Sequence, residues 1–86
     1  MWYVYILRCA DNSLYAGVTT EPQRRLQEHN VDNKLGARYT RARRPVEMVY
    51  QEECGSRSEA CQRESEIKKM TRTAKEQLVS SFVAVA

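Results

Sequence analysis

An unbroken run of apolar residues near the start of the chain predicts a β-strand at the centre of a sheet. Residues Trp2–Cys9 are the expected strand, and Trp2–Leu7 within it are apolar on both alternating faces, as in a strand that is covered on two sides. Asp11, Asn12 and Ser13 supply turn chemistry, so the chain is expected to return as a hairpin into a second strand, Leu14–Thr19. Asn12 or Ser13 is expected to adopt the left-handed conformation.

The length of this hairpin loop decides which tyrosines share a surface. A three-residue loop, Asp11–Ser13, pairs Cys9 with Tyr15 and puts the odd-numbered residues of both strands on one face. A two-residue loop would move Tyr15 to the face opposite Tyr5, and no common tyrosine site could form. We predict the three-residue loop, which gives one surface lined by Tyr3, Tyr5, Tyr15, Gly17 and Thr19. The glycine in this strand permits close backbone approach.

A basic helix is expected to follow the hairpin, from Thr20 to about Asn30. Thr20 and Gln23 form a Thr-x-x-Gln capping box, and Pro22 falls in the first turn, where its missing N–H costs little. The apolar edge of this helix is thin, and Leu26 is its expected anchor. Arg25 and His29, four residues apart, lie on one face of the same helix.

A third strand and two further helices complete the predicted fold. Val46–Gln51 alternates as a strand, and a long helix is expected to run to about Met70. Capping boxes mark both helix starts: Ser56 with Glu59, and Thr73 with Glu76 before the anchors Ala74, Leu78 and Phe82. The prediction is an α+β fold with a small three-stranded antiparallel sheet flanked by helices in the order ββαβαα. Residues 1–86 are expected to form a single domain.

One acidic residue falls within the apolar stripe of the long helix. Ala60, Ile67 and Thr71 are spaced for one helix face, and Glu64 lies between them. A carboxylate on an inward stripe requires a cationic partner, either an arginine or a metal ion.

The positive charge of the chain is concentrated in one loop. The formal net charge is +3, and five cations occur within eleven residues that contain no acid: Lys34, Arg38, Arg41, Arg43 and Arg44. Without those five the net charge is 3 − 5 = −2, so the basic character is local and indicates a polyanion-binding patch. The low apolar content of the segment from Val31 to Pro45 predicts a loop that is mobile until a partner binds.

The cysteines and the length of the apolar runs narrow the class of protein to which the chain can belong. The three cysteines form no C-x-x-C pair, which argues against a disulfide framework or a zinc ribbon and favours buried reduced thiols. A mixed zinc site that combines these cysteines with His29 remains a minor alternative. The apolar runs are far shorter than a membrane span, and no signal-peptide pattern is present, so a cytoplasmic protein is expected.

Taken singly, each candidate residue has an ordinary structural explanation. Tyrosines in strands are more often packing residues, and Arg25 could merely pair with Glu21 on the helix surface. His29 alone could be a surface or capping histidine, and a basic loop is often only solvated. Together, two tyrosines, an arginine, a histidine and an inward glutamate suit phosphodiester hydrolysis, which needs charge neutralisation, a carboxylate for a metal ion and a base for water.

The motifs themselves resemble those of the GIY-YIG endonuclease superfamily over nearly the whole chain. The first motif element is Tyr3-Val4-Tyr5 and the second is Tyr15-Ala16-Gly17, and Thr19, Arg25 and His29 follow at the family's spacing. The run from Gly36 to Arg41 resembles the loop of short stand-alone bacterial members, whose function is largely uncharacterised, and the helix with Ala60, Glu64, Ile67 and Lys68 resembles the metal-binding helix of the family. Tyr3 stands where the first element has glycine, Val4 and Ala16 replace isoleucines, and no asparagine follows Glu64.

The resemblance implies a role for each matching residue. Tyr5 would be the general base or a helper of the attacking water, with Tyr15 beside it, and Arg25 would steady the phosphorus. His29 would orient the site or protonate a leaving group, and Glu64 would ligate one Mg²⁺ or Mn²⁺ ion. The basic cluster and Tyr39 would bind nucleic acid, with Gly17 allowing the backbone to approach. The implied function is a divalent-metal-dependent DNA endonuclease acting in repair or recombination; the alternatives are a weak or inactive nucleic-acid-binding module of the same fold and, third, a protein-interaction adaptor.

Overall fold

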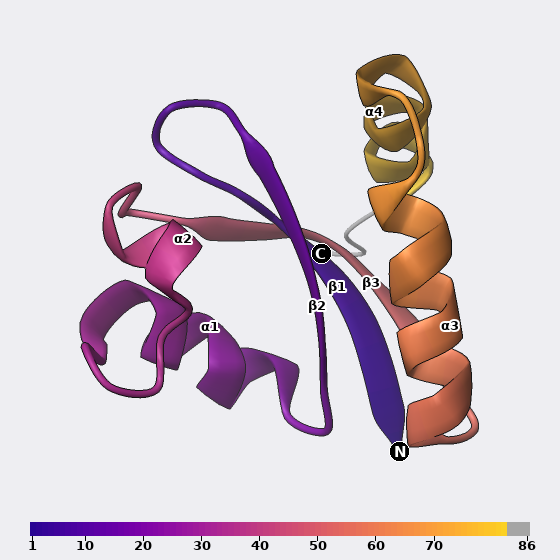
Figure 1. Ribbon diagram of the computed structural model, residues 1–86, viewed down its shortest axis with the longest axis horizontal. Helices are drawn as coiled ribbons and strands as arrows, with labels where there is room; N and C mark the ends of the chain where they lie inside the picture. The colour runs from indigo at the N-terminus through magenta and orange to yellow at the C-terminus, as the bar shows by residue number, and fades with distance from the viewer. Residues whose placement is uncertain (83–86) are drawn as a thin grey trace.

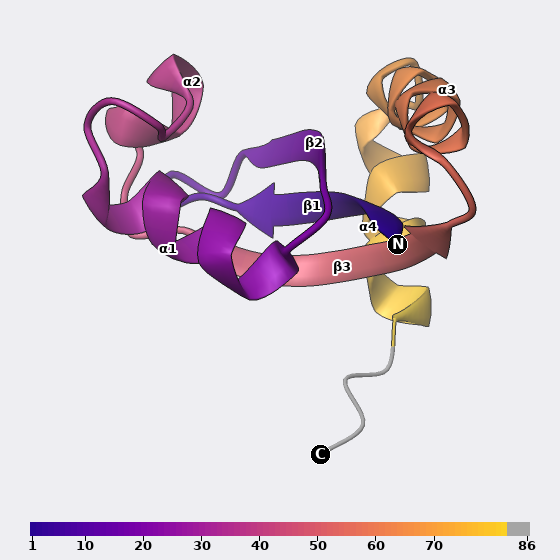
Figure 2. The same ribbon diagram turned by 90° about the horizontal axis from the view of Figure 1, so that it is seen from below.

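The computed structural model, which describes residues 1–82, contains a three-stranded antiparallel sheet with two helices on each side (Figures 1 and 2). The sheet order is β2-β1-β3, so the apolar first strand is central, as predicted. The elements are β1 (Trp2–Arg8), β2 (Leu14–Thr19), α1 (Pro22–Val31), α2 (Arg38–Arg41), β3 (Glu47–Cys54), α3 (Arg57–Lys68) and α4 (Arg72–Ser81). The predicted α+β class and the order ββαβαα are confirmed, with one short additional helix, α2. Residues 83–86 of the predicted domain lie outside the described residues.

The hairpin confirms the predicted face but not the predicted pairing. Leu7 pairs with Tyr15 and Tyr5 with Gly17, so the loop runs over five residues, Cys9–Ser13, instead of three. The loop is longer because it forms its own turn: the Cys9 amide donates to the Ser13 carbonyl at 2.9 Å. Asn12 adopts the expected left-handed conformation, with φ of 70°. Because both loop lengths are odd, the odd-numbered residues still share one face.

The alternation of β1 produces two apolar cores, one on each side of the sheet. The even-numbered side, with Val4 and Ile6 at its centre, packs against α3 and α4. The odd-numbered side, with Tyr5 and Leu7, faces α1. Leu26, the expected anchor of α1, is only partly buried, and the residue that α1 buries completely is His29. The second core therefore contains polar side chains.

The caps of two helices differ from the sequence prediction. The N-cap of α1 is Glu21, without a side-chain cap, because Pro22 is already the first helical residue and Thr20 therefore stands too early. For α4, Thr71 accepts from the Ala74 amide at 3.1 Å, so Thr71 and not Thr73 is the cap. Thr71 consequently does not continue the apolar stripe of α3.

The other element boundaries largely follow the pattern. Ser56 caps α3 as predicted, accepting from the Glu59 amide at 3.2 Å, but the helix ends at Lys68, before Met70. β3 is longer than predicted because its pairing with β1 continues to Trp2 and Cys54. None of the helices in the described part of the chain has the length and apolar character that a membrane crossing needs.

Candidate active site at the edge of strand β2

Gly17 leaves the space in which the phenol of Tyr5 lies. The two residues are paired across β1 and β2, and a Cβ atom built on Gly17 would lie 2.5 Å from the Tyr5 hydroxyl oxygen. Any larger residue would therefore displace the tyrosine. The group that lies against this glycine is the Tyr5 side chain, and the predicted close backbone approach at Gly17 stays a prediction.

A chain of hydrogen bonds connects Tyr5, His29 and Thr40. The Tyr5 hydroxyl lies 2.8 Å from His29 Nε2, and His29 Nδ1 lies 2.8 Å from the Thr40 hydroxyl. Thr40 donates its own proton to the Ala37 carbonyl at 2.9 Å, so it accepts from His29 Nδ1–H. The remaining ring nitrogen, Nε2, then accepts the hydroxyl proton of Tyr5.

Burial keeps both members of this pair neutral at pH 7. His29 is 0% exposed, and burial together with the nearby Arg25 cation lowers its pKa to about 4. Burial raises the pKa of the Tyr5 phenol to about 12, although the Arg25 guanidinium opposes this shift. The structure thus holds a neutral imidazole that accepts a hydrogen bond from a neutral phenol.

Arg25 lies beside this pair, on the side of α1 that faces the loop. Its guanidinium donates to Glu28 at 3.0 Å and to the Leu35 carbonyl at 2.5 Å. The partner is thus Glu28, three residues on, and not Glu21 as the surface-pair alternative required. The arginine is half-buried, oriented by two contacts, and close enough to influence the pKa values of both Tyr5 and His29.

Glu64 approaches the same place from the other side of the sheet. Its side chain on α3 is 23% exposed and pairs with Lys68, four residues on, at 3.5 Å. Its charge is one of the influences that raise the Tyr5 pKa, so the carboxylate lies within electrostatic reach of the phenol. Because α1 and α3 lie on opposite sides of the sheet (Figure 2), the site wraps around the free edge of β2.

A metal ion at Glu64 would have few protein ligands. Among residues 1–82, no group of three or more histidine, cysteine, aspartate or glutamate side chains could hold a metal ion, which also removes the mixed zinc site. The cysteines are free thiols: Cys9 and Cys54 are buried and Cys61 is partly buried. One carboxylate still fits Mg²⁺, which keeps several waters and uses substrate phosphates as further ligands.

Tyr15 connects the buried site to the surface. Its ring packs edge-on against His29, with centroids 5.4 Å apart, and stacks on Tyr39 with centroids 5.7 Å apart. The Arg43 guanidinium lies 3.9 Å from the centroid of the Tyr39 ring. The two tyrosines therefore form an aromatic wall between the Tyr5–His29 pair and solvent, with Arg43 close to its outer member.

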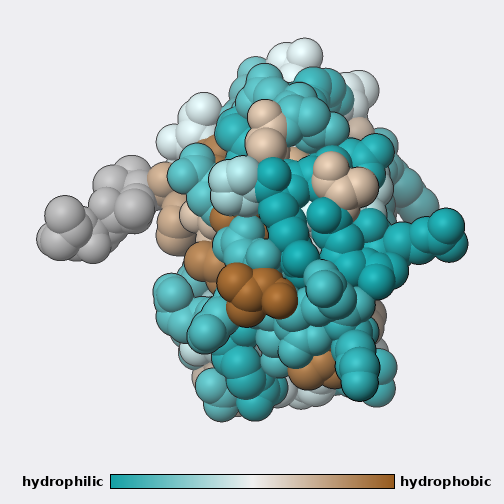
Figure 3. All heavy atoms as spheres, turned by 90° about the vertical axis from the view of Figure 1, so that its left-hand side faces the viewer, coloured by the Kyte–Doolittle hydropathy of each residue, from teal (hydrophilic) through white to brown (hydrophobic). Residues whose placement is uncertain are grey.

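The basic cluster divides into exposed cations and structural ones. Lys34, Arg38 and Arg41 are exposed. The side of the molecule that carries α1 and α2 is largely hydrophilic (Figure 3). Arg43 pairs with Asp11 at 3.1 Å, and Arg44 donates to the carbonyls of His29 and Asp32 and to Asn33 Oδ1 at 2.6–2.9 Å. These arginine contacts and the short helix α2 give the segment a defined structure, and its expected mobility before a partner binds stays a prediction.

Thr40 is the site residue that the sequence reasoning missed. It is 0% exposed, yet it stands between Tyr39 and Arg41 in a run that reads as solvated. One signal was available: a buried histidine needs partners for both ring nitrogens, and Thr40 is the only hydroxyl-bearing residue other than Tyr39 between Val31 and Pro45.

Comparison with known proteins identifies the family of the chain. The family model of the GIY-YIG catalytic domain matches residues 1–77. A UPF0213 protein of Desulfotalea psychrophila is 55% identical over 80 residues, covering 93% of this chain and 72% of the relative.

Two solved structures are similar as well. The solution NMR structure of a protein from E. faecalis is 51% identical, with a TM-score of 0.61, and covers 93% of this chain and 83% of the other. The solution NMR structure of a UPF0213 protein from Bacillus halodurans is 46% identical, with a TM-score of 0.58 and coverages of 93% and 84%. With the motif tyrosines, the arginine, the histidine and the glutamate gathered at one edge of the sheet, the chain belongs to the GIY-YIG family of nuclease domains.

Proposed function

We propose that this protein is a divalent-metal-dependent DNA endonuclease that hydrolyses phosphodiester bonds at the edge of β2, in DNA repair or recombination. The observation that supports the proposal best is the Tyr5–His29–Thr40 chain, with distances of 2.8 Å at both histidine nitrogens. A buried, neutral tyrosine–histidine pair with a fixed direction of proton transfer is costly to build, and it is of direct use to a reaction that must deprotonate water.

In the proposed reaction, Tyr5 transfers a proton without becoming a phenolate. The attacking water gives a proton to the phenol oxygen as the phenol gives its own proton to His29 Nε2. The water oxygen forms the new bond to phosphorus, the bond to the leaving oxygen breaks, and a solvent proton neutralises that oxygen. His29 then returns its proton through Tyr5 to solvent, which restores the neutral pair. This relay suits a phenol whose pKa is about 12, because it avoids a free phenolate at neutral pH.

Access to Tyr5 is restricted to one direction. The residue is only 1% exposed, so in the proposed reaction the water would approach the phenol oxygen over Gly17, which has no side chain of its own. The incoming phosphodiester carries a negative charge, which raises the proton affinity of His29 when substrate is bound. The low pKa of His29 in the free protein therefore does not prevent it from accepting the proton.

Arg25 and Glu64 would handle the charge of the phosphate. Arg25 offers a planar guanidinium, which can grip two phosphate oxygens at once and neutralise charge that develops at phosphorus. Glu64 would hold one Mg²⁺ or Mn²⁺ ion, which supplies charge neutralisation at the phosphate oxygens when it is bound. The exposed cations Lys34, Arg38 and Arg41 would position the nucleic-acid backbone.

The rival function is a nucleic-acid-binding module with little or no turnover. The near-complete burial of Tyr5 and the missing asparagine after Glu64 favour it. Both functions predict salt-dependent DNA binding, so only strand cleavage separates them.

The decisive substitution is Glu64→Gln, tested with Glu66→Gln as its matched control. Glu66 lies on the same helix and is more exposed, with its own i,i+3 partner, Arg63. We expect Glu64→Gln to bind DNA and to have an unfolding free energy within about 0.5 kcal/mol of the parent's, since the variant loses one partly exposed i,i+4 ion pair. It should also abolish Mg²⁺- or Mn²⁺-dependent cleavage, and Glu66→Gln should leave cleavage unchanged. Equal cleavage by both variants would remove Glu64 from the site, and no cleavage by the parent on single-stranded, duplex, flap or branched DNA would favour the binding module.

A further inference from the structure

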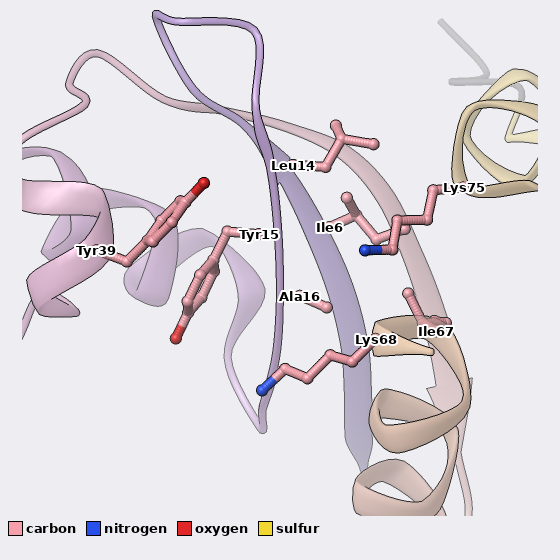
Figure 4. Close-up of a pocket in the computed structure, with 8 residues that line it drawn as sticks. All are labelled: Ile6, Leu14, Tyr15, Ala16, Tyr39, Ile67, Lys68 and Lys75. Atoms are coloured by element: carbon pink, nitrogen blue, oxygen red, sulfur yellow. The ribbon is translucent and has the colours of Figure 1, made fainter. Parts of the chain in front are cut away.

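A surface cavity of about 150 Å³ lies beside the proposed active site, over the free edge of β2. Apolar side chains from β1, β2 and α3 line its base: Ile6, Leu14, Ala16 and Ile67. Figure 4 shows Tyr15 and Tyr39 on one side of β2, and Lys68 and Lys75 reaching toward the strand from α3 and α4 on the other. The cavity thus combines an apolar base, an aromatic wall and a cationic rim.

The two lysines at the rim differ in whether they have an ion-pair partner. Lys68 pairs with Glu64 at 3.5 Å, which places it next to the proposed metal ligand. Lys75 has no ion pair or side-chain hydrogen bond within residues 1–82, although it lines the cavity. A partly buried lysine beside an apolar surface favours an anionic ligand that also carries an apolar part.

The shape and chemistry of the cavity match an unpaired nucleobase. An apolar cavity of about 150 Å³ is large enough for a single aromatic ring such as benzene. A purely apolar ligand would leave Lys75 without an anionic partner, and a free phosphate would leave the apolar base unfilled. A nucleotide supplies both parts, a flat ring and a phosphate, and bases stack on tyrosine whatever their sequence.

The cavity is also continuous with the site that would cut the strand. Tyr15 lines the cavity and packs against His29, and Lys68 lines the cavity and pairs with Glu64. A strand whose phosphate lies between Arg25 and Glu64 can therefore place a neighbouring base over the edge of β2.

We propose that this cavity binds one unpaired nucleobase next to the scissile phosphate, so that the preferred substrate is a nucleic acid with a single-stranded or unstacked nucleotide at the cleavage point. The inference rests on the proposed function. A base inside a duplex is stacked and paired, and it reaches such a cavity only after it leaves the stack. Specificity would then come from the lack of pairing, with little dependence on sequence.

The first test locates the ligand by NMR in chelator, where no cleavage takes place. Thymidine 5′-monophosphate should shift the methyl signals of Leu14, Ala16 and Ile67, and inorganic phosphate at the same concentration should not. Shifts that are identical for the nucleotide and for phosphate, or that are confined to the basic cluster, would overturn the proposal.

The second test uses Lys75→Ala with Lys69→Ala as its matched control, since Lys69 is exposed and does not line the cavity. In chelator at 0.1 M salt, Lys75→Ala should weaken binding of an oligothymidylate roughly fivefold, the effect of leaving one single-strand phosphate without its cation, and Lys69→Ala should not. An oligonucleotide with abasic sites should bind the parent roughly tenfold more weakly than the intact strand. Equal binding of abasic and intact strands would reject the cavity even if the protein cleaves DNA, and base-dependent binding without cleavage would reject the nuclease and keep the cavity.

Discussion

The burial of His29 predicts a loss of stability between pH 7 and pH 5 that a single residue controls. His29 is the only histidine in the chain, and burial lowers its pKa to about 4, whereas an unfolded histidine has a pKa of about 6.5. The unfolded chain therefore binds a proton in this range that the folded chain does not. Stability must fall as the pH drops below the unfolded value, and this decline ends only near the folded pKa.

The size of the effect follows from the two pKa values. At pH 5 the unfolded histidine is almost fully protonated and the folded one is almost fully neutral, and at pH 7 both are mostly neutral. The difference amounts to a loss of about 2 kcal/mol of unfolding free energy between pH 7 and pH 5. For a domain of this size, that corresponds to a decrease of roughly 10 °C in melting temperature.

Other shifted acids contribute at lower pH. The pKa of Glu76 is lowered to about 2 by hydrogen bonds from Arg8 and Arg72, so stability from that carboxylate is lost as the pH falls from about 4.5 toward 2. Asp11 and Asp32 also have lowered pKa values, starting from 3.8. A comparison restricted to pH 7 and pH 5 therefore isolates the histidine.

The assay is urea unfolding, monitored by circular dichroism at both pH values, for the parent and for His29→Gln. The glutamine variant is expected to be less stable overall, but its unfolding free energy should change little between pH 7 and pH 5. A parent whose stability is the same at both pH values would refute the buried neutral imidazole. A glutamine variant that keeps the full pH dependence would assign the effect to another group.

Three further predictions concern the site and the basic surface. Gly17→Ala should displace the Tyr5 phenol, which lowers the unfolding free energy by roughly 1–3 kcal/mol and removes most cleavage activity. Gly55→Ala is the control, because its new methyl group meets the flexible Glu59 carboxylate, and it should change stability and cleavage little. Melting curves and cleavage rates test both expectations. Arg25→Lys keeps the charge but loses the planar fork, so turnover should fall far more than DNA affinity, and equal activity would return Arg25 to a surface role. The double variant Arg38→Ala with Arg41→Ala should have a shallower slope of log DNA affinity against log salt concentration. The slope should change by up to about 0.9 for each duplex phosphate that is no longer neutralised, and an unchanged slope would mean that these cations are only solvated.

Strand periodicity predicted more of this protein than helix patterning did. The alternation of side chains is a fixed property of a strand, so an odd hairpin loop was enough to place Tyr5 and Gly17 on one face, even though the pairing itself was displaced by two residues. The displacement came from a local turn between Cys9 and Ser13, whose hydrogen bonds leave no mark on an apolar pattern.

The polar core on the odd-numbered side could not be read from the sequence. A histidine on a basic helix resembles a surface residue, and its burial depends on Thr40, eleven residues later, in a stretch that reads as solvated. The position of Glu64 could be predicted only in part. Its helix face followed from the sequence, but the placement of α3 across the sheet from α1 depends on the path of the chain. Motif spacing identified these residues as a group, although their contacts had to come from the fold.

The basic cluster shows why its five cations should not be treated as one surface. Arg44 donates to the backbone carbonyl of His29 at 2.6 Å and to that of Asp32 at 2.9 Å, so it fixes the end of α1 that carries the proton acceptor. Its removal would take one donor from each of these two part-buried carbonyls and would loosen the end of α1, whether or not Arg44 also binds a phosphate. A drop in DNA affinity in an Arg44 variant would therefore not distinguish a binding role from a structural one. The exposed pair Arg38 and Arg41 avoids this ambiguity, because Arg41 donates only to the Asn33 carbonyl and neither residue contacts α1 through its side chain among the bonds of residues 1–82.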